Sequence, residues 1–245
     1  MSADPGRGAE LAARLAAVRV RIDRACTASG RPREGVHLVV VTKYFPASDV
    51  EALAGLGVAE IGESRDQEAS AKVDELRAMA AEPASPLATA WPTVHFVGQL
   101  QTKKASSVAR YADVVHSLDR PKLAAALDDA AARAGRVLDV LVQVSLDGDV
   151  GRGGVTPERA GELADAAADL THLRLRGVMA VAPRGAEPLE AFATLAAVAD
   201  GIRSSHPGAS WISAGMSGDL EQAVAIGATH LRVGSAILGS RPPLR

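Results

Sequence analysis

Short β-branched runs alternate along this chain with longer stretches rich in alanine and leucine. The runs predict strands over residues 36–42, 58–61, 94–97, 114–116, 137–144, 173–178, 210–213 and 229–233. Apolar residues at helical spacing predict helices over residues 10–29, 47–55, 67–79, 106–110, 120–134, 157–169, 189–204 and 219–227. Regular alternation of strand and helix is typical of a parallel sheet.

Eight such strands in a chain of 245 residues predict a (β/α)8 barrel of the TIM type, preceded by an extra N-terminal helix. An open doubly wound sheet is the alternative. Because no long Pro/Gly/Ser-rich linker divides the sequence, we expect one domain over residues 1–245. Functional side chains of such barrels lie at the C-terminal ends of the strands, so candidates are sought there.

Composition narrows the classes of partner. A formal net charge of −2 provides no long-range field that would attract nucleic acid or anionic lipid. The sequence has neither an uninterrupted apolar leader nor a run of about 20 apolar residues, so we expect a cytoplasmic protein without a membrane span. The single cysteine, Cys26, fits a reducing compartment and excludes an internal disulfide.

Lys43 is the candidate reactive amine. It ends the run HLVVVTK, where a period of two places it on the same face as Val39 and Val41, at the expected mouth of the barrel. Desolvation favours the neutral amine, which is the form that attacks an aldehyde. A lysine that ends a strand in solvent is the alternative. The chain uses arginine for most of its positive charges, and this bias favours amine chemistry at Lys43.

Two small-residue loops are candidates for binding a phosphate. Ser213, Gly215 and Ser217 follow the seventh predicted strand, and Gly234 and Ser235 follow the eighth. Small residues allow backbone N–H groups to approach an anion at a helix start, and phosphate sites after strands seven and eight recur in barrels. Ordinary turns, with Ser217 as a helix N-cap, are the alternative.

Arg232 ends the eighth predicted strand, which would neighbour the strand of Lys43 in a closed barrel. A ligand joined to Lys43 and held by the two loops would have its ring within reach of this guanidinium. A surface arginine or an ion pair is the alternative interpretation.

Taken together, six segments resemble the pyridoxal phosphate homeostasis protein family, whose fold is that of the N-terminal barrel of alanine racemase. The segments are VVVTK, GESRDQE, HFVGQLQTKK, LRGVMAV, ISAGMSGD and RVGSAILG. The resemblance implies pyridoxal 5′-phosphate (PLP) as the cofactor, a Schiff base on Lys43, and Arg232 facing the pyridine nitrogen. It also implies a phosphate site made of Ser213, Gly215, Met216, Ser217, Gly234 and Ser235.

Two positions depart from the family pattern. Ser64 replaces the asparagine of the second motif, and Lys103 replaces the asparagine before Lys104. In the family both amides line the cofactor side of the mouth. A serine is shorter than an asparagine, so we expect cofactor affinity or loop order at Ser64 to differ.

Three functions compete. The resemblance favours a monomeric carrier that binds PLP and passes it to PLP-dependent apo-enzymes, with catalysis not its main role. An amino-acid racemase needs a second base, which alanine racemase takes from a tyrosine of another domain. The only tyrosines of this chain are Tyr44 and Tyr111. We expect Tyr44 to point away from Lys43. A Schiff-base aldolase needs nearby acids, for which Glu63 is the only candidate. No histidine spacing suggests a metal site.

Overall fold

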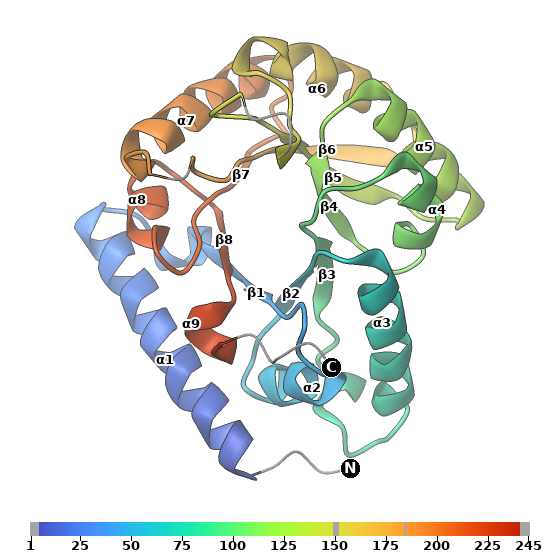
Figure 1. The fold of residues 1–245 in the computed structure, drawn as a ribbon, viewed down its shortest axis with the longest axis vertical. Helices are drawn as coiled ribbons and strands as arrows, with labels where there is room; N and C mark the ends of the chain where they lie inside the picture. The colour runs from blue at the N-terminus through green and yellow to red at the C-terminus, as the bar shows by residue number, and fades with distance from the viewer. Residues whose placement is uncertain (1–4, 149–151, 184, 241–245) are drawn as a thin grey trace.

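The computed structural model describes residues 5–148, 152–183 and 185–240, and its strands form one closed parallel barrel in the order β1 to β8 (Figure 1). The strands are β1 (His37–Val41), β2 (Glu60–Glu63), β3 (Thr93–Phe96), β4 (Val114–Leu118), β5 (Leu138–Gln143), β6 (Leu173–Met179), β7 (Trp211–Ser213) and β8 (His230–Val233). Pairing of His37 with His230 and of Val39 with Arg232 joins the last strand to the first. The predicted TIM-type fold is confirmed, and the open sheet is excluded.

Helices surround the barrel (Figure 1). They are α1 (Pro5–Ala28), α2 (Ala47–Gly55), α3 (Asp66–Ala80), α4 (Ala105–Val108), α5 (Pro121–Arg133), α6 (Ala160–Ala168), α7 (Pro188–Ser205), α8 (Leu220–Ala225) and α9 (Ser235–Leu238). The sequence predicted the positions of α1 to α8, but a 3-10 turn over Pro157–Arg159 replaces the expected α-helical start of α6, and another 3-10 turn over Thr102–Lys104 precedes α4. The predicted span 1–245 also contains residues 1–4, 149–151, 184 and 241–245, which lie outside the described residues.

The strands separate two apolar regions. Side chains such as Val40 and Ile61 belong to a large cluster packed between the strands and the helices. A second, much smaller cluster consists of Val114, Leu141 and Met179. Much of the remaining barrel interior is polar, which requires hydrogen-bond partners inside the barrel because unpaired buried polar groups are costly.

The extra N-terminal helix supports the loop that follows β7. Its apolar face is fully buried, as the spacing predicted, through Leu11, Leu15, Val18 and Ile22. On the same helix, Arg21 donates to the backbone oxygen of Ser217 (3.0 Å) and forms an ion pair with Glu221 (2.8 Å). Helix α1 therefore holds in place one of the two loops that the sequence predicted to bind a phosphate. No helix in the described ranges has both the length and the apolar character needed to cross a lipid bilayer.

Candidate functional site

Lys43 lies at the C-terminal end of the barrel, two residues beyond the end of β1. Its side chain is half-buried, and Nζ lies 5.9 Å from the centre of the Tyr44 ring. The preceding residue, Thr42, is buried and donates from its hydroxyl to Glu63 (2.7 Å). The backbone N–H of Tyr44 donates to the carboxylate of Glu68. The position of the Lys43 backbone is therefore set by side chains of β2 and α3.

The prediction that Tyr44 points away from Lys43 is wrong. Strand geometry ends at Val41, so the alternation of side chains no longer applies at Tyr44, three residues later. Tyr44 has a left-handed backbone with a φ of 71°. Its ring lies beside the Lys43 amine and also 5.7 Å from the guanidinium of Arg65. The left-handed turn therefore brings the tyrosine to the lysine.

Glu63, the candidate acid of an aldolase, is fully buried behind this turn. Its carboxylate accepts from Thr42 and from Nζ of Lys72, which lies 2.6 Å away and also donates to the backbone oxygen of Thr42 (2.8 Å). Burial raises the pKa of Glu63, and the Lys72 ammonium partly opposes this effect. Its hydrogen bonds are used to hold the turn, which argues against a role as an acid at the mouth.

The loops after β7 and β8 meet through their hydroxyls. Ser217 Oγ lies 3.2 Å from Ser235 Oγ and accepts from the backbone N–H of Ala236 (3.3 Å). Gly215 has a φ of +87°, and a Cβ there would lie 2.5 Å from Cβ of Ala223, so only glycine fits the turn. The structure thus brings together two loops whose contacting serines, Ser217 and Ser235, are 18 residues apart in sequence.

Met216 and Gly234 complete this group. The Met216 side chain is exposed, and its backbone N–H donates to Asp219 (2.5 Å), which places that carboxylate against the loop. A Cβ on Gly234 would lie 3.1 Å from the backbone oxygen of Val41, so the β8 loop approaches the end of β1 closely. Helices α8 and α9 have only six and four residues, so their dipoles add less than the sequence pattern predicted.

Arg232 is buried inside the barrel, with 5% of its surface exposed. It donates to Ser213 Oγ (2.5 Å) and to the backbone oxygen of Ala180 (2.8 Å). Burial lowers the pKa of Arg232 to about 10, with a smaller opposing effect of Asp219, and the guanidinium remains protonated at neutral pH. The interpretation as a surface arginine is wrong.

A line of buried polar side chains continues from Arg232 through the barrel. Ser213 Oγ lies 2.9 Å from His116 Nδ1, and His116 Nε2 lies 2.8 Å from His95 Nδ1. Because Ser213 accepts from Arg232, its own proton is free for His116, which then carries its proton on Nε2 and donates to His95. Burial lowers the pKa of His116 well below 6.5, and the nearby His95 and Arg232 lower it further.

The line ends at the opposite, N-terminal end of the barrel. His95 Nε2 lies 3.3 Å from Glu60 Oε2, and Glu60 Oε1 lies 2.8 Å from His37 Nδ1. Burial by itself would raise the pKa of Glu60, but the imidazoles of His95, His230 and His37 outweigh it and hold the pKa at about 2. This line of polar side chains was not predicted from the sequence. The available signal was that several predicted strands carry histidine at inward positions.

The two positions that depart from the family pattern lie beside the mouth. Ser64 is half-buried and lines a cavity of about 500 Å³ together with residues of the loops after β2 and β3, including Lys104. Lys104 forms an ion pair with Asp66 (3.0 Å), while Lys103 is exposed. A Cβ on Gly98 would lie 2.2 Å from the Ser64 backbone oxygen, so these two loops pack backbone to backbone.

The sequence is similar to that of a known class of barrel. A family model described as "Alanine racemase, N-terminal domain" matches residues 14–242. Curated relatives named "Pyridoxal phosphate homeostasis protein" are 44% identical in Mycobacterium tuberculosis, covering 98% of this chain and 96% of the relative, and 33% identical in Escherichia coli, covering 95% and 97%. The chain belongs to the family of pyridoxal phosphate homeostasis proteins.

A solved structure is also similar to this chain in sequence and fold. PipY of Synechococcus elongatus, described with PLP bound, is 31% identical, with a TM-score of 0.79 and coverage of 94% of this chain and 100% of that chain. Both the family resemblance and the alanine-racemase-type barrel expected from the sequence are therefore confirmed.

Proposed function

We propose that this protein binds PLP at the mouth of the barrel and acts in holding and delivering the cofactor rather than in catalysis. One observation carries the proposal: a lysine amine, a buried guanidinium and two joined Gly/Ser loops gather where β8 meets β1. The relatives named for PLP homeostasis and the PLP-bound PipY structure support it.

The residues present suit the parts of this cofactor. We assign Lys43 to the Schiff base. Ser217, Gly234 and Ser235 are assigned to the phosphate, together with Ser213, Gly215 and Met216 of the β7 loop. Gly234 lies close to β1, with a Cβ position only 3.1 Å from the backbone oxygen of Val41, and a small residue there suits a backbone phosphate cradle. Ser64 would contribute from the β2 side.

Arg232 is assigned to the pyridine nitrogen, and this assignment explains the weak catalysis that we propose. When bound, PLP supplies an aldehyde and an electron-withdrawing ring. The protonated guanidinium disfavours a second positive charge beside it, so the ring nitrogen stays unprotonated and withdraws electrons less strongly.

The racemase alternative needs a base on each face of the cofactor, and the two tyrosines of the chain do not provide this pair. Tyr44 lies beside the Lys43 amine. The Tyr111 hydroxyl is buried 3.5 Å from Asp66, and burial raises its pKa. We therefore keep the carrier as the proposed function. The proposal includes a cytoplasmic, monomeric, single-domain protein whose partners are PLP-dependent apo-enzymes.

The PLP-loaded protein is expected to turn over amino acids no faster than free PLP at the same concentration. Incubation with L-alanine and several other amino acids, followed by chiral analysis and keto-acid detection, measures this directly. Formation of a visible absorption band on adding PLP confirms loading in the same sample. Sustained turnover that disappears in the Lys43→Ala variant would establish the racemase-like enzyme instead.

Replacing Gly234 by leucine is expected to weaken PLP binding by at least about tenfold, or about 1.4 kcal/mol, with little effect on unphosphorylated pyridoxal. The added side chain meets Val41 at 3.1–3.9 Å and must shift the β8 loop, to which we assign part of the phosphate contact. Titration of both ligands by absorption gives the preference. Gly208→Leu is the matched control, because nothing lies within 4 Å of a Cβ there. An unchanged preference in Gly234→Leu would show that the phosphate binds elsewhere.

A further inference from the structure

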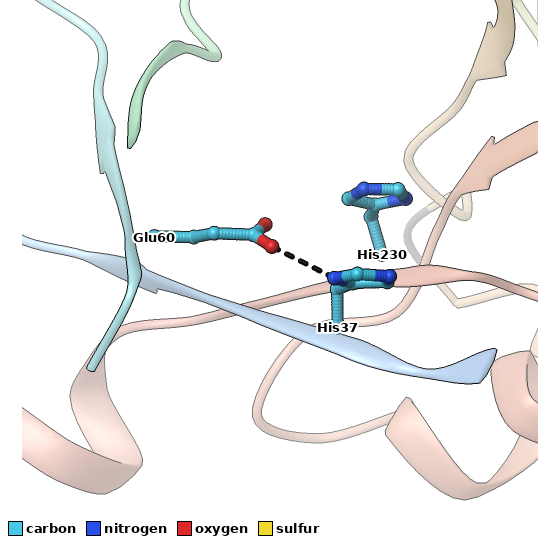
Figure 2. Close-up of side chains that lie close together, drawn as sticks. All are labelled: His37, Glu60 and His230. Atoms are coloured by element: carbon cyan, nitrogen blue, oxygen red, sulfur yellow. Dashed lines mark hydrogen bonds and ion pairs between the residues drawn. The ribbon is translucent and has the colours of Figure 1, made fainter. Parts of the chain in front are cut away.

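The N-terminal end of the barrel, opposite the mouth, carries a second group of chemically active side chains (Figure 2). His230, His37 and Glu60 are the first residues of the adjacent strands β8, β1 and β2. His37 and His230 are direct partners in the sheet register. One ligand atom from each of the three residues lies within 4.8 Å of the others.

Two imidazoles and one carboxylate are a donor set that suits Zn²⁺, which in sites with three protein ligands keeps a fourth position for water. Solvent can reach this group, because 48% of the His37 side chain is exposed. The other two side chains are far more enclosed, with 16% of Glu60 and 1% of His230 exposed. The group therefore resembles an open, three-ligand metal site more than a surface ion pair.

The hydrogen bonds of His230 leave one of its nitrogens available. Its Nδ1 lies 2.8 Å from Thr229 Oγ1. The Thr229 hydroxyl donates to the backbone oxygen of Ile212 (3.3 Å) and accepts from the backbone N–H of Ile212 (2.9 Å). Since its proton is used, Thr229 accepts from His230 Nδ1, and the lone pair of the neutral ring is on Nε2. Such an oxygen behind a histidine is the usual outer partner of a metal ligand.

Glu60 has an oxygen with unused capacity. Its Oε1 is paired with His37 Nδ1 at 2.8 Å. Its Oε2 is buried, lies 3.3 Å from His95 Nε2 and makes no hydrogen bond of acceptable geometry. Incomplete bonding of a buried carboxylate costs free energy, and a bound cation would recover it.

A fixed positive charge that acts on His230 is Arg176, whose guanidinium lies over the Trp211 ring (4.3 Å) and faces Asp139 (3.6 Å). Asp139 therefore offsets part of that charge. Trp211 in turn lies 4.2 Å from the His230 ring, so its fluorescence can report on binding at this position.

We propose that His37, Glu60 and His230 form a Zn²⁺ site at the N-terminal end of the barrel, with water as the fourth ligand. The His37 and His230 rings are stacked, with centroids 4.7 Å apart and planes 8° apart. Parallel rings do not aim their lone pairs at one point, so binding requires rotation of the exposed His37 ring. Tetrahedral zinc with bonds of about 2.0–2.1 Å places its ligand atoms roughly 3.3 Å apart, a modest contraction of the observed group. The site lies at the opposite end of the barrel from the proposed cofactor pocket.

The test uses the full chain loaded with PLP, stripped of metal with a chelator and then titrated with ZnCl₂ in phosphate-free buffer. Calorimetry is expected to show one Zn²⁺ per chain for the parent protein, with a change in Trp211 fluorescence. Loss of a direct ligand in His37→Ala or Glu60→Gln is expected to weaken binding by more than about 100-fold, since changes in outer partners alone cost 10–100-fold.

His206→Ala is the matched control, because it removes a histidine that is not a proposed ligand and that forms a surface pair with Asp165 (2.6 Å). This variant is expected to bind zinc as the parent does. The proposal is overturned by an absence of stoichiometric binding, by unchanged affinity in His37→Ala, or by a loss of binding in His206→Ala. His37 is half-exposed, so its alanine variant tests the site even if Glu60→Gln fails to fold.

Discussion

After borohydride reduction, the parent protein is expected to carry a stable pyridoxyl label on Lys43. The Lys43→Ala variant is expected to carry no such label. The label requires an imine, and an imine requires a primary amine at the cofactor carbonyl. Of the other four lysines, Lys72 is buried and bonded to Glu63, while Lys103 and Lys122 are exposed and Lys104 is paired with Asp66. Reduction in the presence of PLP, followed by peptide mass mapping, measures the site of attachment.

Lys103→Ala is the matched control, because it removes an exposed lysine beside the same mouth. This variant is expected to keep the label on Lys43 and the visible absorption band. Label found mainly on Lys103 or Lys104 in the parent protein would move the reactive amine to the loop after β3 and contradict the assignment.

Acidification is expected to destabilise the protein through His116, by about 2 kcal/mol between pH 7 and pH 5. Burial holds the pKa of His116 well below its ordinary value of 6.5, so the folded protein keeps the ring neutral while the unfolded chain takes up a proton. The stabilising contribution is therefore complete above pH 6.5 and is lost as pH falls towards the folded pKa. The slope approaches about 1.4 kcal/mol per pH unit below 6.5.

Urea unfolding of the metal-free protein at several pH values between 5 and 8 measures this slope. Other titrating groups contribute to the pH dependence of unfolding in both proteins. The informative quantity is therefore the difference in slope between the parent and His116→Gln. The glutamine amide can still bond within the line but does not titrate, and the variant is expected to show the smaller pH dependence. Equal slopes in the two proteins would show that folding does not lower the pKa of His116.

The sequence by itself determined the architecture. Apolar periodicity identified all eight strands, with ends displaced by no more than about two residues, because each strand must bury an outward face against the helices. Apolar residues at helical spacing also predicted helix α1, whose apolar face is buried. The six sequence motifs were sufficient to indicate the family. They include glycines at tight turns and close contacts where a side chain would clash, such as Gly215.

The tertiary structure alone decided which side chains meet. Closure of β8 against β1 places Arg232 opposite Val39 and His230 opposite His37, pairs separated by more than 190 residues in sequence. The backbone φ of Tyr44 turned its ring towards Lys43, against the alternation expected of a strand. Periodicity states which face a residue occupies, whereas a hydrogen bond depends on the distance between atoms on different strands. That distance is set by the register and closure of the whole barrel, so the polar line from Arg232 to Glu60 was visible only in three dimensions.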